Sequence, residues 1–358
     1  MRNIAFFIMD MSNGGGTERV TSVIANQLVK QHNVFIISAL NGMDPVFNIA
    51  SDIKLLSLGR GGLQAKNLRQ NYHISHAIKK CVRNNKIDIL IVVDTILMNY
   101  CIPIILHKKK LGLKIIAWEQ FNYYVQGRQR IFARKLATKY ADTVLTLVKG
   151  DKQNWKDNFK HINRMEYIYN PVTLPENIHS DLSHKTVIAV GRLEPQKGFD
   201  LLLKSWSIVE KSTTDWKLQI IGDGSQRDEL NKYIVNNKLK NVELISFQKN
   251  ISQYYLNASI FAFSSRFEGF GLVLVEAQNY GLPVVSYACK EGPSEIVTDN
   301  INGFLVEPEN TELFAEKLIE LINDDKLRVA FAENSGKDLV RFKVVNIILK
   351  WNELLESL

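Results

Sequence analysis

Continuous apolar runs recur along this chain, and they limit the possible fold more than any other feature of the sequence. The first two runs are NIAFFIMD (3–10) and NVFIISAL (33–40), with a helical stretch at 17–31 between them. Apolar residues that are continuous rather than alternating are typical of strands in a parallel sheet covered by helices on both faces. The remaining runs of the first half are IDILIVVD (87–94), LKIIAW (113–118) and DTVLTLV (142–148). This half therefore predicts a doubly wound α/β domain.

The pattern restarts after a polar, proline-containing connector at 167–185. Six further runs follow, each with a helical segment or turn behind it: TVIAVGRL, WKLQIIGDG, NVELISF, SIFAFSS, LPVVSY and GFLVEP. A chain of 358 residues is also too long for one ordinary core. We expect two Rossmann-like domains, at 1–170 and 171–343, and a last helix at 344–358 that can pack back onto the first. A ligand should bind at the carboxyl ends of the strands, in the cleft between the domains.

Several classes of protein are excluded by composition. The apolar runs are far shorter than the roughly 20 residues of a membrane-spanning helix, and the first one meets Asp10 too soon for a signal peptide. The three cysteines are isolated, which fits a reducing cytoplasm. The seven histidines are scattered, and no pair of aspartates is spaced as DxD. We therefore expect no metal and no cofactor.

Charge is divided unevenly along the chain. Residues 1–170 hold 25 Lys and Arg against 11 Asp and Glu, or +14, whereas 171–358 hold 20 against 26, or −6. Residues 53–87 and 120–141 are rich in bases and contain no acid. These bases can be ordinary solvated helix faces, or a surface for an anionic membrane leaflet or a phosphate-bearing acceptor. We do not expect nucleic acid as a partner, because no recognisable binding motif accompanies the charge.

Three motifs lie where strands end and helices begin. The first, NGGGTER (13–19), has glycines that can reach positive φ, a backbone that can approach a phosphate or sugar, and Thr17 as a possible helix cap. As a dinucleotide fingerprint it fails at Arg19, and GDGSQR (222–227) fails at Arg227. Both can equally be tight turns without a ligand.

The second motif, VGRLEPQKGFDLLL (190–203), places two cations after a strand. Arg192 and Lys197 can hold a diphosphate there, the arginine as a fork and the lysine as a point charge. Solvated turn charges are the alternative.

The third motif, RFEGFGLVLVEAQNYGLPVV (266–285), contains two glutamates. Glu268 lies in a turn, and Glu276 lies about one turn into a helix that begins near Gly271. The N–H groups of Gly271, Leu272 and Val273 would attract an anion in front of this helix. Two carboxylates suit that place if each accepts hydrogen bonds from hydroxyls, one of a sugar ring and one of a ribose. A nucleotide sugar has these groups in this order, because its diphosphate lies between the hydroxyl-rich sugar and the ribose.

Together these motifs, with GPSEIVTDNINGFLVEP (292–308), resemble the retaining glycosyltransferases of family 4, which have the GT-B fold, over nearly the whole chain. The resemblance implies sugar transfer from a nucleotide diphosphate donor held mainly by the second domain. It implies that Arg192 and Lys197 contact the diphosphate, that Glu268 binds the donor sugar and that Glu276 binds the ribose. Gly15 and Gly16 would face the diphosphate from the first domain.

One segment departs from the family. Many relatives have a histidine in the loop that here reads WEQFNYY (118–124), and this chain has Gln120 in its place. A catalytic role centred on histidine is therefore not expected, although Glu119 and Gln120 can still line the acceptor side.

The expected activity is a metal-independent transfer, with retention, of a hexose or N-acetylhexosamine from a UDP-sugar to a saccharide or polyprenyl-diphosphate-linked acceptor. The resemblance implies a role in cell-surface polysaccharide or lipopolysaccharide biosynthesis. The basic first domain would work at the inner face of an anionic membrane, from the cytoplasm. A sugar-nucleotide epimerase of the same fold and a noncatalytic nucleotide-sugar-binding protein are the alternatives.

Overall fold

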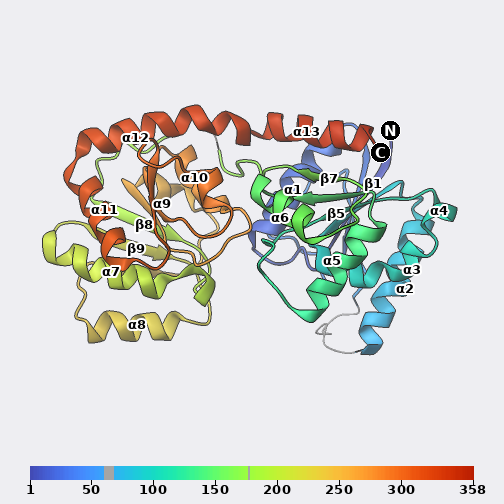
Figure 1. The fold of residues 1–358 in the computed structure, drawn as a ribbon, viewed down its shortest axis with the longest axis horizontal. Helices are drawn as coiled ribbons and strands as arrows, with labels where there is room; N and C mark the ends of the chain where they lie inside the picture. Colours follow the sequence, from blue (N-terminus) through green and yellow to red (C-terminus); the bar gives the residue numbers. More distant parts are fainter. Residues whose placement is uncertain (60–67, 176–177) are drawn as a thin grey trace. The chain divides into compact units, whose positions relative to one another are not determined.

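A computed structural model describes residues 1–59, 68–175 and 178–358 (Figure 1). The chain forms two compact units, the first made of Met1–Thr173 together with Val344–Leu358, and the second of Leu174–Lys343. The expected division at 170 and 171 lies close to this boundary. Of the bases counted in the first half, Arg60 and Lys66 lie outside the described residues.

The first unit is built on seven parallel strands in the order β3-β2-β1-β4-β5-β6-β7. The strands are β1 (Asn3–Ile8), β2 (Asn33–Ser38), β3 (Lys54–Ser57), β4 (Ile89–Val93), β5 (Lys114–Trp118), β6 (Thr143–Thr146) and β7 (Met165–Tyr167). The helices are α1 (Gly16–Leu28), α2 (Leu68–Asn84), the 3-10 helix η1 (Thr95–Cys101), α3 (Ile102–Ile105), α4 (Lys108–Leu111), α5 (Arg128–Tyr140), α6 (Lys149–Asn158) and α13 (Val344–Glu356).

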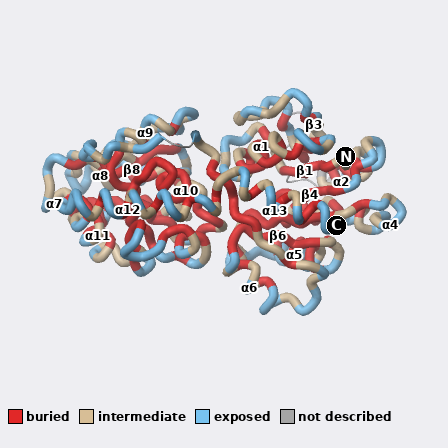
Figure 2. Tube along the Cα trace, turned by 90° about the horizontal axis from the view of Figure 1, so that it is seen from above, coloured by how far each residue is buried: buried red, intermediate tan, exposed pale blue. Residues whose placement is uncertain are grey.

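Alternate side chains of this sheet are buried on its two opposite faces. Ala5 and Phe7 of β1 belong to a core shared with α2, η1 and α5. Phe6, between them, contacts Trp351 of α13 with the ring centroids 6.4 Å apart. Because successive side chains of a strand point to opposite faces, a strand buried on both faces must be apolar throughout. This requirement explains the continuous apolar runs, which Figure 2 shows as buried segments.

Helix α13 completes the first unit although it follows the whole of the second in the chain. Trp351 is fully buried and packs edge-on against Trp118, with ring centroids 5.0 Å apart. The expected return of a last helix to the first domain corresponds to this contact.

The second unit has six parallel strands in the order β10-β9-β8-β11-β12-β13. The strands are β8 (Thr186–Val190), β9 (Lys217–Ile221), β10 (Val242–Ile245), β11 (Ile260–Phe263), β12 (Val284–Tyr287) and β13 (Gly303–Val306). The helices are η2 (Pro195–Lys197), α7 (Phe199–Ser212), α8 (Arg227–Asn236), α9 (Ser252–Leu256), α10 (Leu272–Asn279), η3 (Pro293–Glu295), α11 (Thr311–Asn323), α12 (Asp325–Asp338) and η4 (Leu339–Phe342).

The main core of the second unit lies between this sheet and helices α7, α8 and α11. It includes Leu202 and Trp206 of α7 and Phe314 and Leu318 of α11, all fully buried. Phe331 of α12 also belongs to this core. Figure 1 shows α9 and α10 on the other side of the strands. Both units therefore have helices on both faces of a parallel sheet, and the expectation of two doubly wound α/β domains is confirmed. No helix in the described ranges is long and apolar enough to cross a membrane.

The packing of α13 leads to a stability prediction. Trp351→Ala should destabilise the first unit by about 3–5 kcal/mol, because it deletes a fully buried indole between Phe6 and Trp118. Urea unfolding followed by circular dichroism would measure the change. Leu349→Ala, in the same helix but at an exposed position, should stay within about 0.5 kcal/mol of wild type. Equal losses in the two variants would contradict the packing role of Trp351.

Candidate functional site

The strand order of the second unit fixes where its loops diverge. From β8 the chain proceeds through β9 to β10 on one side, whereas β11, β12 and β13 extend to the other side. The loops after β8 and β11 therefore lead to helices on opposite faces of the sheet, α7 and α10, and ligands of such sheets bind at the carboxyl ends of the strands where this divergence occurs. Arg192 and Lys197 follow β8, and Glu268 follows β11.

Lys197 and Glu268 form an ion pair at this place, with Lys197 Nζ 2.7 Å from Glu268 Oε1. Both side chains are largely shielded from water. The two residues are 71 positions apart in the sequence, and their direct contact was not anticipated from it. A lysine has three N–H donors, so Lys197 can keep this partner and still donate to a phosphate oxygen.

The loops after β8 and β11 approach each other at Gly198. A Cβ atom there would lie 2.1 Å from the carbonyl oxygen of Ser264, and φ is +63°. Only glycine fits both conditions. The Ser264 hydroxyl also donates to the carbonyl of Lys197 at 2.9 Å. The backbone next to Lys197 is thus fixed against the loop that carries Glu268.

Arg192 lies exposed in the same loop as Lys197. Two residues on, the Glu194 carboxylate accepts hydrogen bonds from the backbone N–H and the hydroxyl of Ser225, at 3.0 and 2.7 Å. These bonds lower the pKa of Glu194, and the charge of Arg192 contributes further. The turn holding Arg192 is therefore fastened to the loop after β9.

Helix α10 begins close to where the sequence indicated. Gly271 is its N-cap with φ +92°, and Leu272 and Val273 form its first turn. Glu276, the fifth residue, is buried, and the Tyr255 hydroxyl donates to its Oε2 at 3.2 Å. Tyr255 was not a candidate, because a tyrosine within a short helix gives no sequence signal of a polar contact. The binding roles of these residues stay predictions.

The glycine turn of the first unit differs in detail from the expectation. Helix α1 begins at Gly16 with Gly15 as N-cap, so Thr17 lies inside the helix and is not its cap. None of the three glycines has positive φ. A Cβ at Gly15 would lie 2.6 Å from Oε2 of Glu18, which is buried. The turn thus has a carboxylate beside the backbone assigned to a diphosphate.

A buried charge network holds the loop that contains Glu119 and Gln120. Glu119 Oε1 accepts from Arg130 at 2.9 Å, and Oε2 accepts from Arg134 at 2.8 Å and from the Thr95 hydroxyl at 2.7 Å. Arg130 also pairs with Asp94 at 2.7 Å, and Asp94 has φ +75°. Burial raises the pKa of Glu119, as does Asp94, while the two guanidinium groups oppose this effect.

This network shows that two of the bases in segment 120–141 are buried and not at the surface. Arg130 and Arg134 belong to the base-rich segment 120–141, for which the sequence predicts an exposed surface, but both are buried and bound to carboxylates. Arg134 also donates to the carbonyls of Asn122 and Tyr123. Glu119 therefore supports the 120–127 loop from inside. Gln120 is buried as well, and its Nε2 has no hydrogen-bond partner among the described residues. A role of either residue on the acceptor side stays a prediction.

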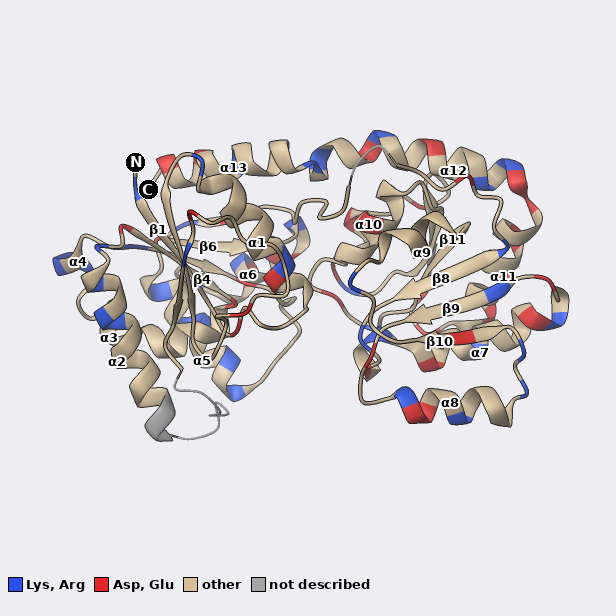
Figure 3. Cartoon of the chain, turned by 180° about the vertical axis from the view of Figure 1, so that it is seen from behind, with Lys and Arg blue, Asp and Glu red and all other residues tan. Residues whose placement is uncertain are grey.

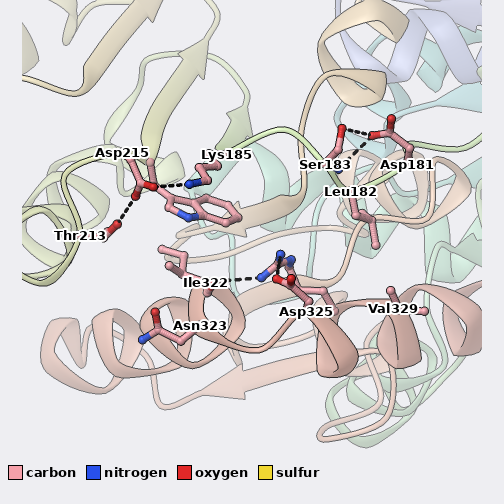
Figure 4. A pocket seen from close by; sticks show the side chains of 12 residues that line it. Asp181, Leu182, Ser183, Lys185, Thr213, Asp215, Ile322, Asn323, Asp325 and Val329 are labelled. Carbon is pink, nitrogen blue, oxygen red and sulfur yellow. Dashed lines mark hydrogen bonds and ion pairs between the residues drawn. The ribbon is translucent and has the colours of Figure 1, made fainter.

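A cavity of about 590 Å³ lies elsewhere in the second unit (Figure 4). Its lining includes Lys185 and Trp216, which directly precede β8 and β9, so it opens at the amino ends of these strands. Lys185 is paired with Asp215 there, and Arg328 with Asp325. Because Lys197 and Glu268 follow the carboxyl ends, this cavity is separate from the candidate site.

Comparison with known proteins supplies a family. Residues 173–338 match the family model described as glycosyl transferases group 1. An uncharacterised glycosyltransferase of Haemophilus influenzae is 33% identical, with 99% of this chain and 100% of that protein covered. A Campylobacter jejuni protein, the GalNAc-alpha-(1->4)-GalNAc-alpha-(1->3)-diNAcBac-PP-undecaprenol alpha-1,4-N-acetyl-D-galactosaminyltransferase, is 26% identical over 99% of this chain and 98% of its own.

The fold is likewise similar to that of solved structures. Anabaena HepE, crystallised in complex with UDP, superposes with a TM-score of 0.80 at 20% sequence identity, covering 100% of both chains. The GT-B fold expected from the sequence motifs is confirmed at the level of each domain's architecture.

The Glu119 network leads to a second prediction. Glu119→Gln should destabilise the first unit by about 3 kcal/mol, because it removes the buried carboxylate that pairs with Arg134 and leaves Arg130 with Asp94 as its carboxylate partner. Hydrogen exchange of the β5 amides would show the loss as faster exchange. Glu166→Gln, which breaks a half-exposed ion pair in the same unit, should cost less than about 1 kcal/mol. Unchanged exchange in Glu119→Gln would contradict the supporting role.

Proposed function

The chain belongs to the glycosyltransferases, and from this premise we propose that it moves a hexose or N-acetylhexosamine from a UDP-sugar to a saccharide acceptor. The observation that carries the proposal is the Lys197–Glu268 pair at the carboxyl ends of the adjacent strands β8 and β11. A cation and a carboxylate held side by side suit a donor that joins a diphosphate to a hydroxyl-rich sugar. The UDP complex of the similarly folded HepE supports the choice of nucleotide.

The proposed reaction breaks the bond between the anomeric carbon and the diphosphate oxygen, and that electron pair leaves with the diphosphate. An acceptor hydroxyl oxygen forms the new bond to the same carbon on the face that the diphosphate leaves, with retention. The hydroxyl proton passes to the departing phosphate. Lys197, Arg192 and the positive N-terminal end of α10 stabilise the developing charge, without a metal ion. Glu268 accepts hydrogen bonds from the sugar, and Glu276 from the ribose.

We further propose that the acceptor is linked to a polyprenyl diphosphate in cell-surface glycan biosynthesis. The name of the Campylobacter relative, which contains PP-undecaprenol, supports this choice. Exposed bases on the first unit support it independently. They lie on α2, α4 and α5, which we call the basic face: Lys80, Arg83, Lys109, Lys110, Arg128, Lys135 and Lys139. Figure 3 shows basic residues along these helices.

Large apolar side chains are exposed among these bases. They are Tyr72 on α2, Ile102 and Leu106 at α3, and Ile131 and Phe132 on α5. Helices α2, η1 and α5 share one core and cover the same face of the sheet, so the apolar and basic side chains project from one layer. Such a mixture suits the interface of an anionic membrane, at the cytoplasmic side, where bases bind headgroups and apolar side chains enter the boundary.

Turnover tests the proposed reaction. Wild type should transfer sugar from a UDP-sugar to an undecaprenyl-diphosphate-linked saccharide, and Lys197→Ala should lower kcat/KM by about 10²-fold, the scale of losing one charge-stabilising donor. Lys185→Ala is the matched control, because Lys185 is paired with Asp215 at the opposite ends of the strands. It should retain wild-type kcat/KM. A loss below about threefold in Lys197→Ala would remove Lys197 from the mechanism.

Vesicle binding tests the basic face. Lys80→Glu together with Arg83→Glu should weaken co-sedimentation with vesicles containing anionic lipid by about 10-fold or more, since each base near such a surface contributes about 1 kcal/mol. The matched control is Lys232→Glu with Lys240→Glu, exposed bases of the second unit. Equal weakening in the two double variants would show that net charge, and not the basic face, governs binding.

A further inference from the structure

Arg266 lies two residues before Glu268, and its side chain turns to the other loop of the site. Its guanidinium forms a bidentate ion pair with Asp200, in which Nη1 donates to Oδ1 and Nη2 donates to Oδ2, both at 2.8 Å. Nη1 also donates to the carbonyl oxygen of Pro195 at 2.8 Å. Pro195 and Asp200 stand on either side of Lys197 in the chain. Arg266 therefore forms hydrogen bonds to the segment that carries Lys197 on both sides of this lysine.

The backbones of the two loops are joined as well. The N–H of Arg266 donates to the carbonyl of Gln196 at 2.8 Å, and Gln196 Nε2 donates to the carbonyl of Phe267 at 3.0 Å. These bonds involve the residues directly before Lys197 and directly before Glu268. Every one of them fixes the distance between the segment bearing the cation and the segment bearing the carboxylate.

The positive charge of Arg266 is balanced by carboxylates of the protein. Its Nε lies 3.3 Å from Oε1 of Glu309, so two carboxylates face one guanidinium. Hydrogen bonds with Asp200 raise the pKa of Arg266. Burial alone would raise the pKa of Asp200, but the bonds and charge of Arg266 outweigh it and lower that pKa. Four hydrogen bonds to two carboxylates and the Pro195 carbonyl use most of the five N–H donors of Arg266, whereas Lys197 pairs with one carboxylate, so Arg266 is not a further anion ligand.

We propose that Arg266 and Asp200 are positioning residues of the donor site, which hold Lys197 where its ammonium group meets both Glu268 and the donor diphosphate. The inference rests on the proposed function, because it assigns these residues to the same nucleotide-sugar site. Arginine is required for the geometry, since its planar fork can bond Asp200 twice and Pro195 at once. A lysine at position 266 would keep the charge but lose the fork.

A double-mutant cycle, measured by nucleotide binding, tests whether Arg266 acts through Lys197. UDP, GDP and ADP are titrated by calorimetry into wild type, and the tightest binder is the probe. Arg266→Lys should weaken its binding by about tenfold, the value of a misdirected charge-assisted hydrogen bond. In a Lys197→Ala background the same change should weaken binding by less than about twofold, because the group it positions is gone. Equal factors in both backgrounds would overturn the proposal.

The control is another arginine-to-lysine substitution in the second unit, at Arg328. Arg328 is buried, pairs with Asp325 and donates to the carbonyls of Leu321 and Ile322, at the amino ends of the strands. Arg328→Lys should lower the thermal unfolding midpoint and leave nucleotide affinity at the wild-type value. If Arg266→Lys behaves like Arg328→Lys, its role is stability alone and the proposal is wrong.

Asp200→Asn provides a second variant, in case Arg266→Lys does not fold. It removes the charge from the other half of the fork and should weaken binding of the probe in the same Lys197-dependent way. The outcomes also separate this inference from the proposed function. No binding of any of the three nucleotides to folded wild type contradicts the function itself. Tight binding that is unaffected by both variants contradicts only the positioning role.

Discussion

Close approach of backbone to backbone is the constraint on which the second unit's site depends. A Cβ at Gly222 would lie 1.9 Å from the carbonyl oxygen of Gly191, so the loops after β8 and β9 are in direct main-chain contact. Gly198 and Ser264 make the corresponding contact between the loops after β8 and β11. With no side chains to separate them, three loops behave as one layer over the strand ends. The contact between these loops sets the distance between Lys197 and Glu268. It also brings Arg266 of one loop within hydrogen-bond distance of Asp200, which follows the other.

Local electric charge at this layer matters more than the charge of the whole half-chain. Residues 171–358 carry a net charge of −6, which opposes an anionic ligand at long range. Exposed charges are screened beyond about 8 Å at physiological salt, so the groups within contact distance decide binding. The first half shows the reverse situation: part of its positive charge is used internally, because Arg130 and Arg134 are bound to Glu119. Counting charges in a sequence therefore overstates the charge that a ligand or membrane meets.

The central strands of both sheets could be predicted from the sequence, as could the edge strands β10 and β13 of the second sheet, but the edge strands β3 and β7 of the first sheet could not. β1 and β4 are buried on both faces, which forces continuous apolar runs such as Ile4–Ile8. β3 and β7 lie at the two edges of their sheet, are short and only partly buried, and therefore lack this signal. In the site, the residue types and their strand ends were predictable from motif spacing. The contacts of Lys197 with Glu268 and of Arg266 with Asp200 span 71 and 66 positions, and no local pattern records such a pair.

The return of α13 to the first unit has a consequence for biosynthesis. While the ribosome makes Leu174–Lys343, the face of β1 and β5 that Trp351 later covers has no α13 to bury it. At about 5–20 residues per second this interval lasts on the order of ten seconds or more. The second unit is continuous in sequence and can fold during that time. Until residues 344–358 emerge, Phe6 and Trp118 lack their contacts with Trp351, and transiently uncovered apolar surface of this kind is what chaperones protect from aggregation.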